Sequence, residues 1–189
     1  MQFISDFADA AVIFPFAFGV WLLLTALGFR IVIGQWAVAV AGVLLSMLAI
    51  KAGWLFVAAQ SGKRAMSPSG HTASACIVYG GLAWLMLRHA AIPWLAIAVP
   101  LLIIAAVGAS RIAVGAHDPA EVAMGAAVGL AGLALLRRAM APGARVPGWP
   151  IMAVAVVVIP LAHGHRLPIE KALHGEIVGR AEPPTGVVR

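Results

Sequence analysis

The chain carries little charge for its length. Of its 189 residues, only 11% are Asp, Glu, Lys or Arg, whereas 62% are hydrophobic. The mean hydropathy of +1.00 lies far above what a water-soluble domain needs to fill one core. The single cysteine, Cys76, excludes an intramolecular disulfide and is interpreted as a core residue. The composition therefore predicts an integral membrane protein.

The apolar residues fall into six runs, most of which approach the roughly 20 residues that a helix needs to cross hydrocarbon. The runs are apolar on every face and rich in Ala and Leu, whereas strands of a closed barrel would alternate between apolar and polar residues. The sequence thus predicts an all-α integral membrane protein, a six-transmembrane-helix bundle. The runs cover approximately residues 9–29, 31–60, 72–88, 92–109, 119–136 and 149–162.

The two ends of the chain differ from the runs between them. The N-terminus, MQFISDFADA, has Asp6 and Asp9 where a secretory signal has basic residues, so we expect the first span to be retained. Residues 1–165 are expected to form the six-span core. The tail, residues 166–189, is expected to form a short amphipathic helix on the membrane surface, followed by disorder from its Pro-Pro pair onward.

Acidic residues are few: 7, against 13 Lys and Arg. The basic residues are scattered over loops and tail, with no basic stripe interleaved with aromatic residues. This pattern argues against a nucleic-acid partner and favours the anionic head groups of membrane lipids.

Because charged side chains are costly inside a bilayer, the polar residues beside the spans carry most of the functional information. They form two clusters, which two complete spans separate. Both clusters are therefore expected on the same side of the membrane, where they can meet. The first cluster holds Lys51, Lys63, Arg64, Ser69, Gly70 and His71, and the second holds Ser110, Arg111, His117, Asp118 and Glu121.

The segment SPSGHTASA, residues 67–75, is typical of a helix start. Ser67 and Pro68 fit an N-cap and a first-turn proline. The amides of Ser69, Gly70 and His71 would then point outward and bind an anion, and the glycine would let a phosphate approach the backbone. A plain helix cap without a ligand explains the segment equally well, but His71 favours the anion site.

The segment AHDPAEV in the second cluster starts another helix. Asp118, Pro119 and Glu121 fit the N-cap, N1 and N3 positions, and His117 lies just outside. Glu121 can either cap the amide of Asp118 or accept a hydrogen bond from His117, which would leave the other ring nitrogen of this histidine as a nucleophile. A structural capping box alone is a strong alternative.

Two motifs together carry a resemblance. PSGH at 68–71, followed by SRIAVGAHDPAE at 110–121, resembles the second and third signature motifs of the type 2 phosphatidic acid phosphatase (PAP2) superfamily, in the form of a small bacterial-type membrane lipid phosphatase. The spacing from Arg111 to His117 matches the family pattern. Glu121 stands where the family has aspartate.

The first motif of the family, a lysine followed six residues later by Arg-Pro, is not intact. If Lys51 is its lysine, Ala58 and Ala59 occupy the arginine and proline positions. Lys63 or Arg64, in the loop that follows, is then expected to supply the missing positive charge.

The resemblance implies a phosphatase that needs neither a metal nor another cofactor. His117 would attack phosphorus to form a phosphohistidine, with Glu121 orienting it, and His71 would protonate the leaving oxygen. Phosphate binding would fall to the cations and the helix-start residues. These are Lys51, Lys63, Arg64, Ser69, Gly70 and Arg111. The expected substrates are lipid phosphates such as undecaprenyl diphosphate, phosphatidic acid or phosphatidylglycerol phosphate.

Other readings compete with this one. A zinc site with help from His163 and His165 is disfavoured by the surrounding cations. An intramembrane serine protease using Ser69 would leave Arg111 without a role. A transporter or a non-enzymatic lipid-phosphate-binding protein would need charge but not two histidines, one with an oriented partner.

The count of basic residues per side does not decide the orientation; the acidic N-terminus favours a bacterial inner-membrane protein with its active site facing the periplasm or exterior.

Overall fold

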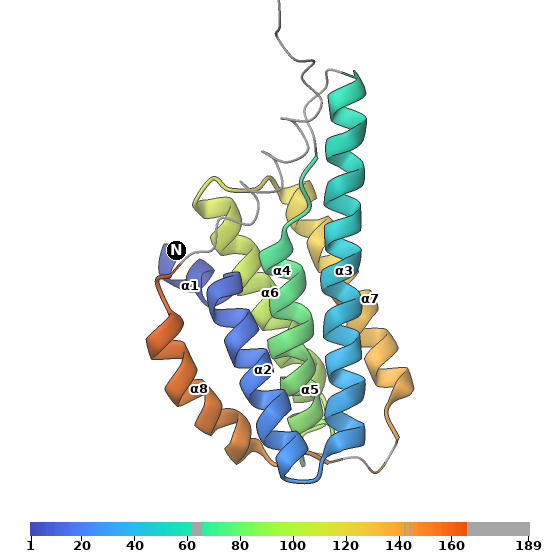
Figure 1. Ribbon diagram of the computed structural model, residues 1–189, viewed down its shortest axis with the longest axis vertical. Coiled ribbons are helices and arrows are strands. Elements are labelled where there is room, and N and C mark those ends of the chain that lie inside the picture. Colours follow the sequence, from blue (N-terminus) through green and yellow to red (C-terminus); the bar gives the residue numbers. More distant parts are fainter. Residues whose placement is uncertain (62–65, 142, 144, 166–189) are drawn as a thin grey trace, which may run out of the picture.

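The computed structural model describes residues 1–61, 66–141, 143 and 145–165. Within these ranges every regular element is helical, and the longer helices run up and down as one bundle (Figure 1). The prediction of an all-α fold is confirmed. The elements are α1 (Gln2–Asp6), α2 (Ala10–Ala26), α3 (Arg30–Ser61), α4 (Gly70–Ala75), η1 (Cys76–Gly80), α5 (Gly81–Leu87), α6 (Leu95–Ala113), α7 (Pro119–Ala139) and α8 (Gly148–Ala162).

Four helices are long and apolar enough to cross a membrane: α3, α6, α7 and the continuous helix Gly70–Leu87 that α4, η1 and α5 form together. The helices α2 and α8 are apolar but have only 17 and 15 residues. Fifteen residues of helix extend about 22 Å, against about 30 Å of hydrocarbon. All six predicted apolar runs are thus helical, whereas a membrane crossing by α2 and α8 stays a prediction.

The helix Gly70–Leu87 lies at the centre of the bundle. Of its apolar window 67% is buried, against 28% to 33% for the other three long helices. Its middle segment, η1, is π-helical, a geometry that often occurs at functional sites. Within this segment the Tyr79 hydroxyl donates a 2.6 Å hydrogen bond to the carbonyl oxygen of Phe7. The central helix therefore holds the N-terminal segment in place.

Glycines let α7 pack closely against this central helix. A methyl group at Gly125 would overlap the carbonyl oxygen of Ser69, and one at Gly129 would lie 2.6 Å from Cβ of Cys76. The small residues Gly125 and Gly129, four positions apart, thus make a close helix contact. Because α7 approaches so closely, its first turn lies beside the first turn of α4, where the two polar clusters meet.

Candidate active site

The candidate site lies at the end of the bundle where α4 and α7 begin and α6 ends (Figure 1). The short helix α1 packs against α6 at the same end. The sequence expectation that the two clusters meet is confirmed by direct hydrogen bonds between them. The backbone amide of Ser69 donates to the carbonyl oxygen of Glu121 at 2.9 Å.

Glu121 makes both contacts that the sequence allowed as alternatives. Its Oε2 atom lies 2.9 Å from Nδ1 of His117 and also accepts the amide hydrogen of Asp118 at 3.3 Å. The Asp118 carboxylate in turn accepts the amide hydrogen of Glu121 at 2.9 Å, which completes the predicted capping box. The capping box and the histidine contact therefore coexist on one carboxylate.

The second oxygen of Glu121 has a partner that sequence reasoning missed. Oε1 accepts the amide hydrogen of Ser67 at 2.9 Å. One buried carboxylate thus receives hydrogen bonds from the third motif through His117 and Asp118, and from the start of the second motif through Ser67. Both of its oxygens therefore help to hold the two motifs in a fixed relation.

His117 is positioned as a nucleophile requires. Its side chain is 2% exposed, and its Nδ1 faces the Glu121 carboxylate. A carboxylate only accepts hydrogen bonds, so in the neutral ring the proton belongs on Nδ1 and the lone pair on Nε2. Within the described residues, Nε2 is buried and has no hydrogen-bond partner. A buried polar atom left in this way is costly unless a ligand or water completes it.

The start of the central helix differs from the prediction. Ser69, not Ser67, is the N-cap: its hydroxyl accepts the amide hydrogen of Thr72 at 3.4 Å and the Thr72 hydroxyl at 3.0 Å. The helix begins at Gly70, and Ser67 and Pro68 precede it outside any regular element. The expectation that the Ser69 amide points outward is also wrong, since that amide donates to Glu121. Anion binding by helix-start amides is thereby restricted to Gly70 and His71.

Lys51 reaches the same helix start from α3. It is 9% exposed, and its Nζ donates to the Ser67 hydroxyl at 3.3 Å. A methyl group at Gly70 would lie 3.7 Å from Cε of Lys51, so the lysine stem passes directly over the glycine. The structure therefore brings Lys51 to the site. Lys63 and Arg64 lie outside the described residues.

Arg111, in the last turn of α6, is connected to His117 through the backbone. The carbonyl oxygen of Arg111 accepts the amide hydrogens of Ala116 and His117 at 3.0 and 3.4 Å. The turn reverses at Gly115, whose φ of +70° favours glycine. Nη1 of the Arg111 guanidinium donates to the Ser5 hydroxyl at 2.6 Å. Ser5, in α1, is a contact that the motif analysis did not anticipate.

A second N-terminal residue, Asp9, contacts the candidate acid. Oδ2 of Asp9 lies 3.6 Å from Nε2 of His71, while Oδ1 caps α2 by accepting the amide hydrogen of Ala11 at 2.9 Å. Asp9 is 6% exposed. The only sequence signal for Ser5 and Asp9 is the polar pattern ISDFAD before the first apolar run, which indicates a helix cap as readily as a site.

The described residues contain no group of three or more His, Cys, Asp or Glu side chains that could hold a metal ion. His163, considered above for a zinc site, instead packs against the rings of Phe3 and Phe7. Its Nε2 lies 3.1 Å from the Phe3 carbonyl oxygen. His163 thus helps to fix the N-terminal segment over this end of the bundle.

The model of the PAP2 superfamily matches residues 51–143. Residues 51–143 belong to the PAP2 superfamily. The match begins at Lys51 and includes both recognised motifs, and together with the apolar helices it fits a membrane phosphatase. Neither a curated protein nor a solved structure gives a significant match. Ser5 and Asp9 precede the matched PAP2 region.

Proposed function

We propose that this PAP2 protein is a membrane-embedded, metal-independent phosphatase of lipid phosphates or diphosphates, acting through a phosphohistidine at His117. The observation that carries the proposal is the environment of His117: Nδ1 faces a carboxylate, and Nε2 is buried with no partner among the described residues. A structural histidine in a capping box would need neither feature. A nucleophile with an orienting partner needs both.

In the first step, the Nε2 lone pair of His117 attacks phosphorus, and the bond from phosphorus to the leaving oxygen breaks. Protonated His71 gives its proton to that oxygen, so the lipid leaves as an alcohol or, from a diphosphate, as a monophosphate. In the second step, water attacks phosphorus and the phosphorus–nitrogen bond breaks. His71 takes the proton of the water and is ready to act again as the acid.

The phosphate would be held by positive charge and by backbone amides. Arg111 and Lys51 supply charge from two different helices, and the amides of Gly70 and His71 begin the central helix. Cations positioned around a transferring phosphoryl group stabilise its negative charge. Lys63 and Arg64 are further candidates for the same task.

The test is a phosphate-release assay with purified full-length protein on undecaprenyl diphosphate, phosphatidic acid and phosphatidylglycerol phosphate. We expect release from at least one of these lipids in the presence of EDTA, and inhibition by vanadate, which resembles the pentacoordinate state of phosphorus. Loss of activity with EDTA and its recovery with zinc would overturn the metal-independent mechanism. Binding of the lipids without any release would favour a carrier or binding protein.

We further propose that the catalytic end faces the exterior of a bacterial inner membrane. The cations Arg30, Arg88, Arg137 and Arg138 occur at the opposite end of the bundle, as expected for a cytoplasmic face. Single cysteines at Ala116 and Ala139, both exposed, would report the orientation in a Cys76→Ala background. In intact cells, an impermeant thiol reagent should label the first and spare the second. The reverse pattern would place the site in the cytoplasm.

A further inference from the structure

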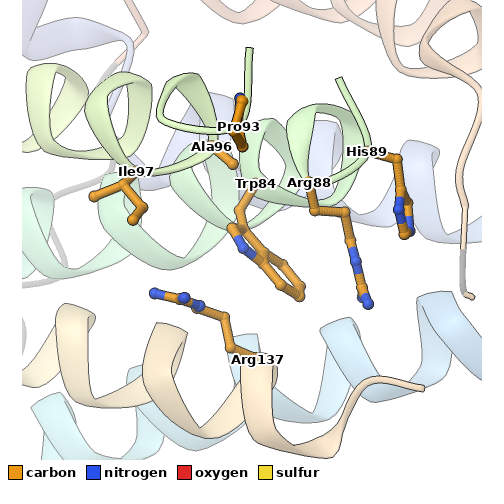
Figure 2. Close-up of a pocket in the computed structure, with 7 residues that line it drawn as sticks. All are labelled: Trp84, Arg88, His89, Pro93, Ala96, Ile97 and Arg137. Carbon is orange, nitrogen blue, oxygen red and sulfur yellow. The ribbon is translucent and has the colours of Figure 1, made fainter. Parts of the chain in front are cut away.

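A cavity lies at the end of the bundle away from the candidate active site. It has a volume of about 370 Å³ and lies where α5 ends, α6 begins and α7 ends (Figure 2). Sixteen residues of α7 separate Glu121 from Arg137, which corresponds to roughly 24 Å along the helix. The cavity is therefore remote from the proposed phosphatase chemistry. Its lining includes Trp84, Arg88, His89, Ala96, Ile97 and Arg137.

Two guanidinium groups converge on one aromatic ring in this cavity. Cζ of Arg88 lies 4.6 Å from the centre of the Trp84 ring, and Cζ of Arg137 lies 5.9 Å from it. Figure 2 shows the indole between the two arginine side chains. Cation–π contacts with the shared ring hold both guanidinium groups at the cavity, but they neutralise neither positive charge. An anion bound at the cavity would.

The described part of the chain offers no carboxylate for this role. Its acidic residues are all at the other end of the bundle, in or beside the first turns of α1, α2 and α7; they are Asp6, Asp9, Asp118 and Glu121. Nη2 of Arg88 donates a hydrogen bond to the main-chain oxygen of Ala141 at 2.9 Å. Positive charge at this cavity is therefore in excess over the acidic groups that the structure places there.

The wall of the cavity indicates the source of the anion. Ile97 lines the cavity and is 50% exposed on the outer surface of α6, a helix apolar enough to cross a membrane. Trp94, three residues earlier, is 62% exposed, as expected for a tryptophan at the level of the lipid head groups. A ligand with a phosphate group and a hydrocarbon chain could place its phosphate beside the arginines and its hydrocarbon chain against Ile97. Free phosphate would contact only the arginines.

We propose that this cavity binds the phosphate group of an anionic membrane lipid, on the membrane face opposite the candidate active site. Arg137 and Arg88 contact the phosphate from two sides, Trp84 forms the floor, and the acyl chain lies against α6. This site would be occupied by bulk lipid rather than by substrate. It does not depend on the proposed phosphatase activity.

The experiment measures lipid retention by the full-length protein in detergent, using native mass spectrometry with phosphatidylglycerol and, separately, phosphatidylcholine of the same acyl chains. The variants are Arg137→Gln and Arg138→Gln. The second is a matched control, because Arg138 is the next residue of the same helix, is exposed and does not line the cavity. Both variants lose one charge at the same helix end and leave the candidate active site unchanged.

We expect Arg137→Gln to weaken phosphatidylglycerol retention about fivefold, the effect of one basic residue near an anionic lipid, and Arg138→Gln to leave it near the original value. Arg137→Lys should retain most of the affinity, which separates loss of charge from misfolding. Equal retention by the Gln variants, or equal retention of phosphatidylcholine by the original protein, would overturn the proposal. Displacement of the lipid by millimolar inorganic phosphate would overturn the lipid assignment in favour of a free-anion site.

Discussion

Both ends of the bundle carry basic side chains, but the groups that surround these side chains differ between the two ends. At the candidate catalytic end, the side chains of Lys51 and Arg111 donate hydrogen bonds to the hydroxyls of Ser67 and Ser5. At the other end, Arg88 and Arg137 share an aromatic ring, and the described residues supply no carboxylate there. The first arrangement can hold one phosphorus atom in a defined geometry. The second can attract an anionic group without positioning it for a reaction.

Glu121 shows most clearly what makes the catalytic end different. It receives hydrogen bonds from Ser67, His117 and Asp118, so one carboxylate fixes a helix start, a neighbouring segment and a ring. A change there should affect geometry and rate together. Substitutions in this hydrogen-bond network and beside it should have effects that decrease from His117 to Ser5.

Replacement of His117 by alanine should have the largest effect. It removes the Nε2 atom that we propose as the nucleophile, so phosphate release should fall by a factor on the order of a thousand or more. The variant should still bind the lipid substrate, because Arg111 and Lys51 remain. Matched measurements of release and of lipid binding check this. A rate near the original value would show that His117 is not the nucleophile.

Glu121→Gln should lower turnover by about a hundredfold, the scale of a positioned acid–base contact. The structure also predicts a loss of stability. One carboxylate oxygen becomes an NH₂ group, which cannot accept a hydrogen bond from Ser67, or from His117 and Asp118, depending on its orientation. A buried donor without an acceptor costs about 1–3 kcal/mol. Thermal unfolding measures this cost and the phosphate-release assay measures the rate.

Two further variants separate the roles of this carboxylate. Asp118→Asn keeps a competent N-cap and should be nearly neutral in both assays. Glu121→Asp keeps the charge and the residue type that the PAP2 motif expects, and should retain substantial activity. If Glu121→Gln left turnover intact while Asp118→Asn abolished it, the partner of His117 would be Asp118.

Sequence alone predicted the helical fold, the meeting of two clusters and the capping box, because each depends on local patterns: apolar runs, helix-start residues and an even number of intervening spans. It misplaced the N-cap of the central helix, since Ser67 and Ser69 both suit that position locally. The choice of Ser69 depends on Glu121, which binds the amide of Ser67 from another helix. Ser5 and Asp9 were missed as site residues for the same reason, as their partners are distant in sequence.

Asp9→Asn tests whether Asp9 acts on the reaction through His71. Asparagine remains a good N-cap for α2, so the fold should persist. We expect the rate of phosphate release from a lipid alcohol to fall about tenfold, at the low end for acid–base catalysis, because the proton donor is less well held. With p-nitrophenyl phosphate the loss in kcat/KM should be small, since nitrophenolate leaves without a proton and kcat/KM does not include the later attack of water. Equal losses on the two substrates would reduce Asp9 to a structural role.

Apart from the near-neutral control Asp118→Asn, the smallest expected effect is that of Ser5→Ala. The Ser5 hydroxyl accepts a hydrogen bond from Nη1 of Arg111, and α1 holds this serine buried against α6. Without the hydroxyl, the guanidinium loses one fixed contact but keeps its charge. A neutral hydrogen-bond partner contributes on the order of 1 kcal/mol, so KM should rise about three- to fivefold with little change in kcat. Steady-state kinetics on the best lipid substrate measures both constants. A lower KM would mean that Ser5 competes with phosphate for Arg111, in which case the N-terminal segment restrains the site instead of completing it.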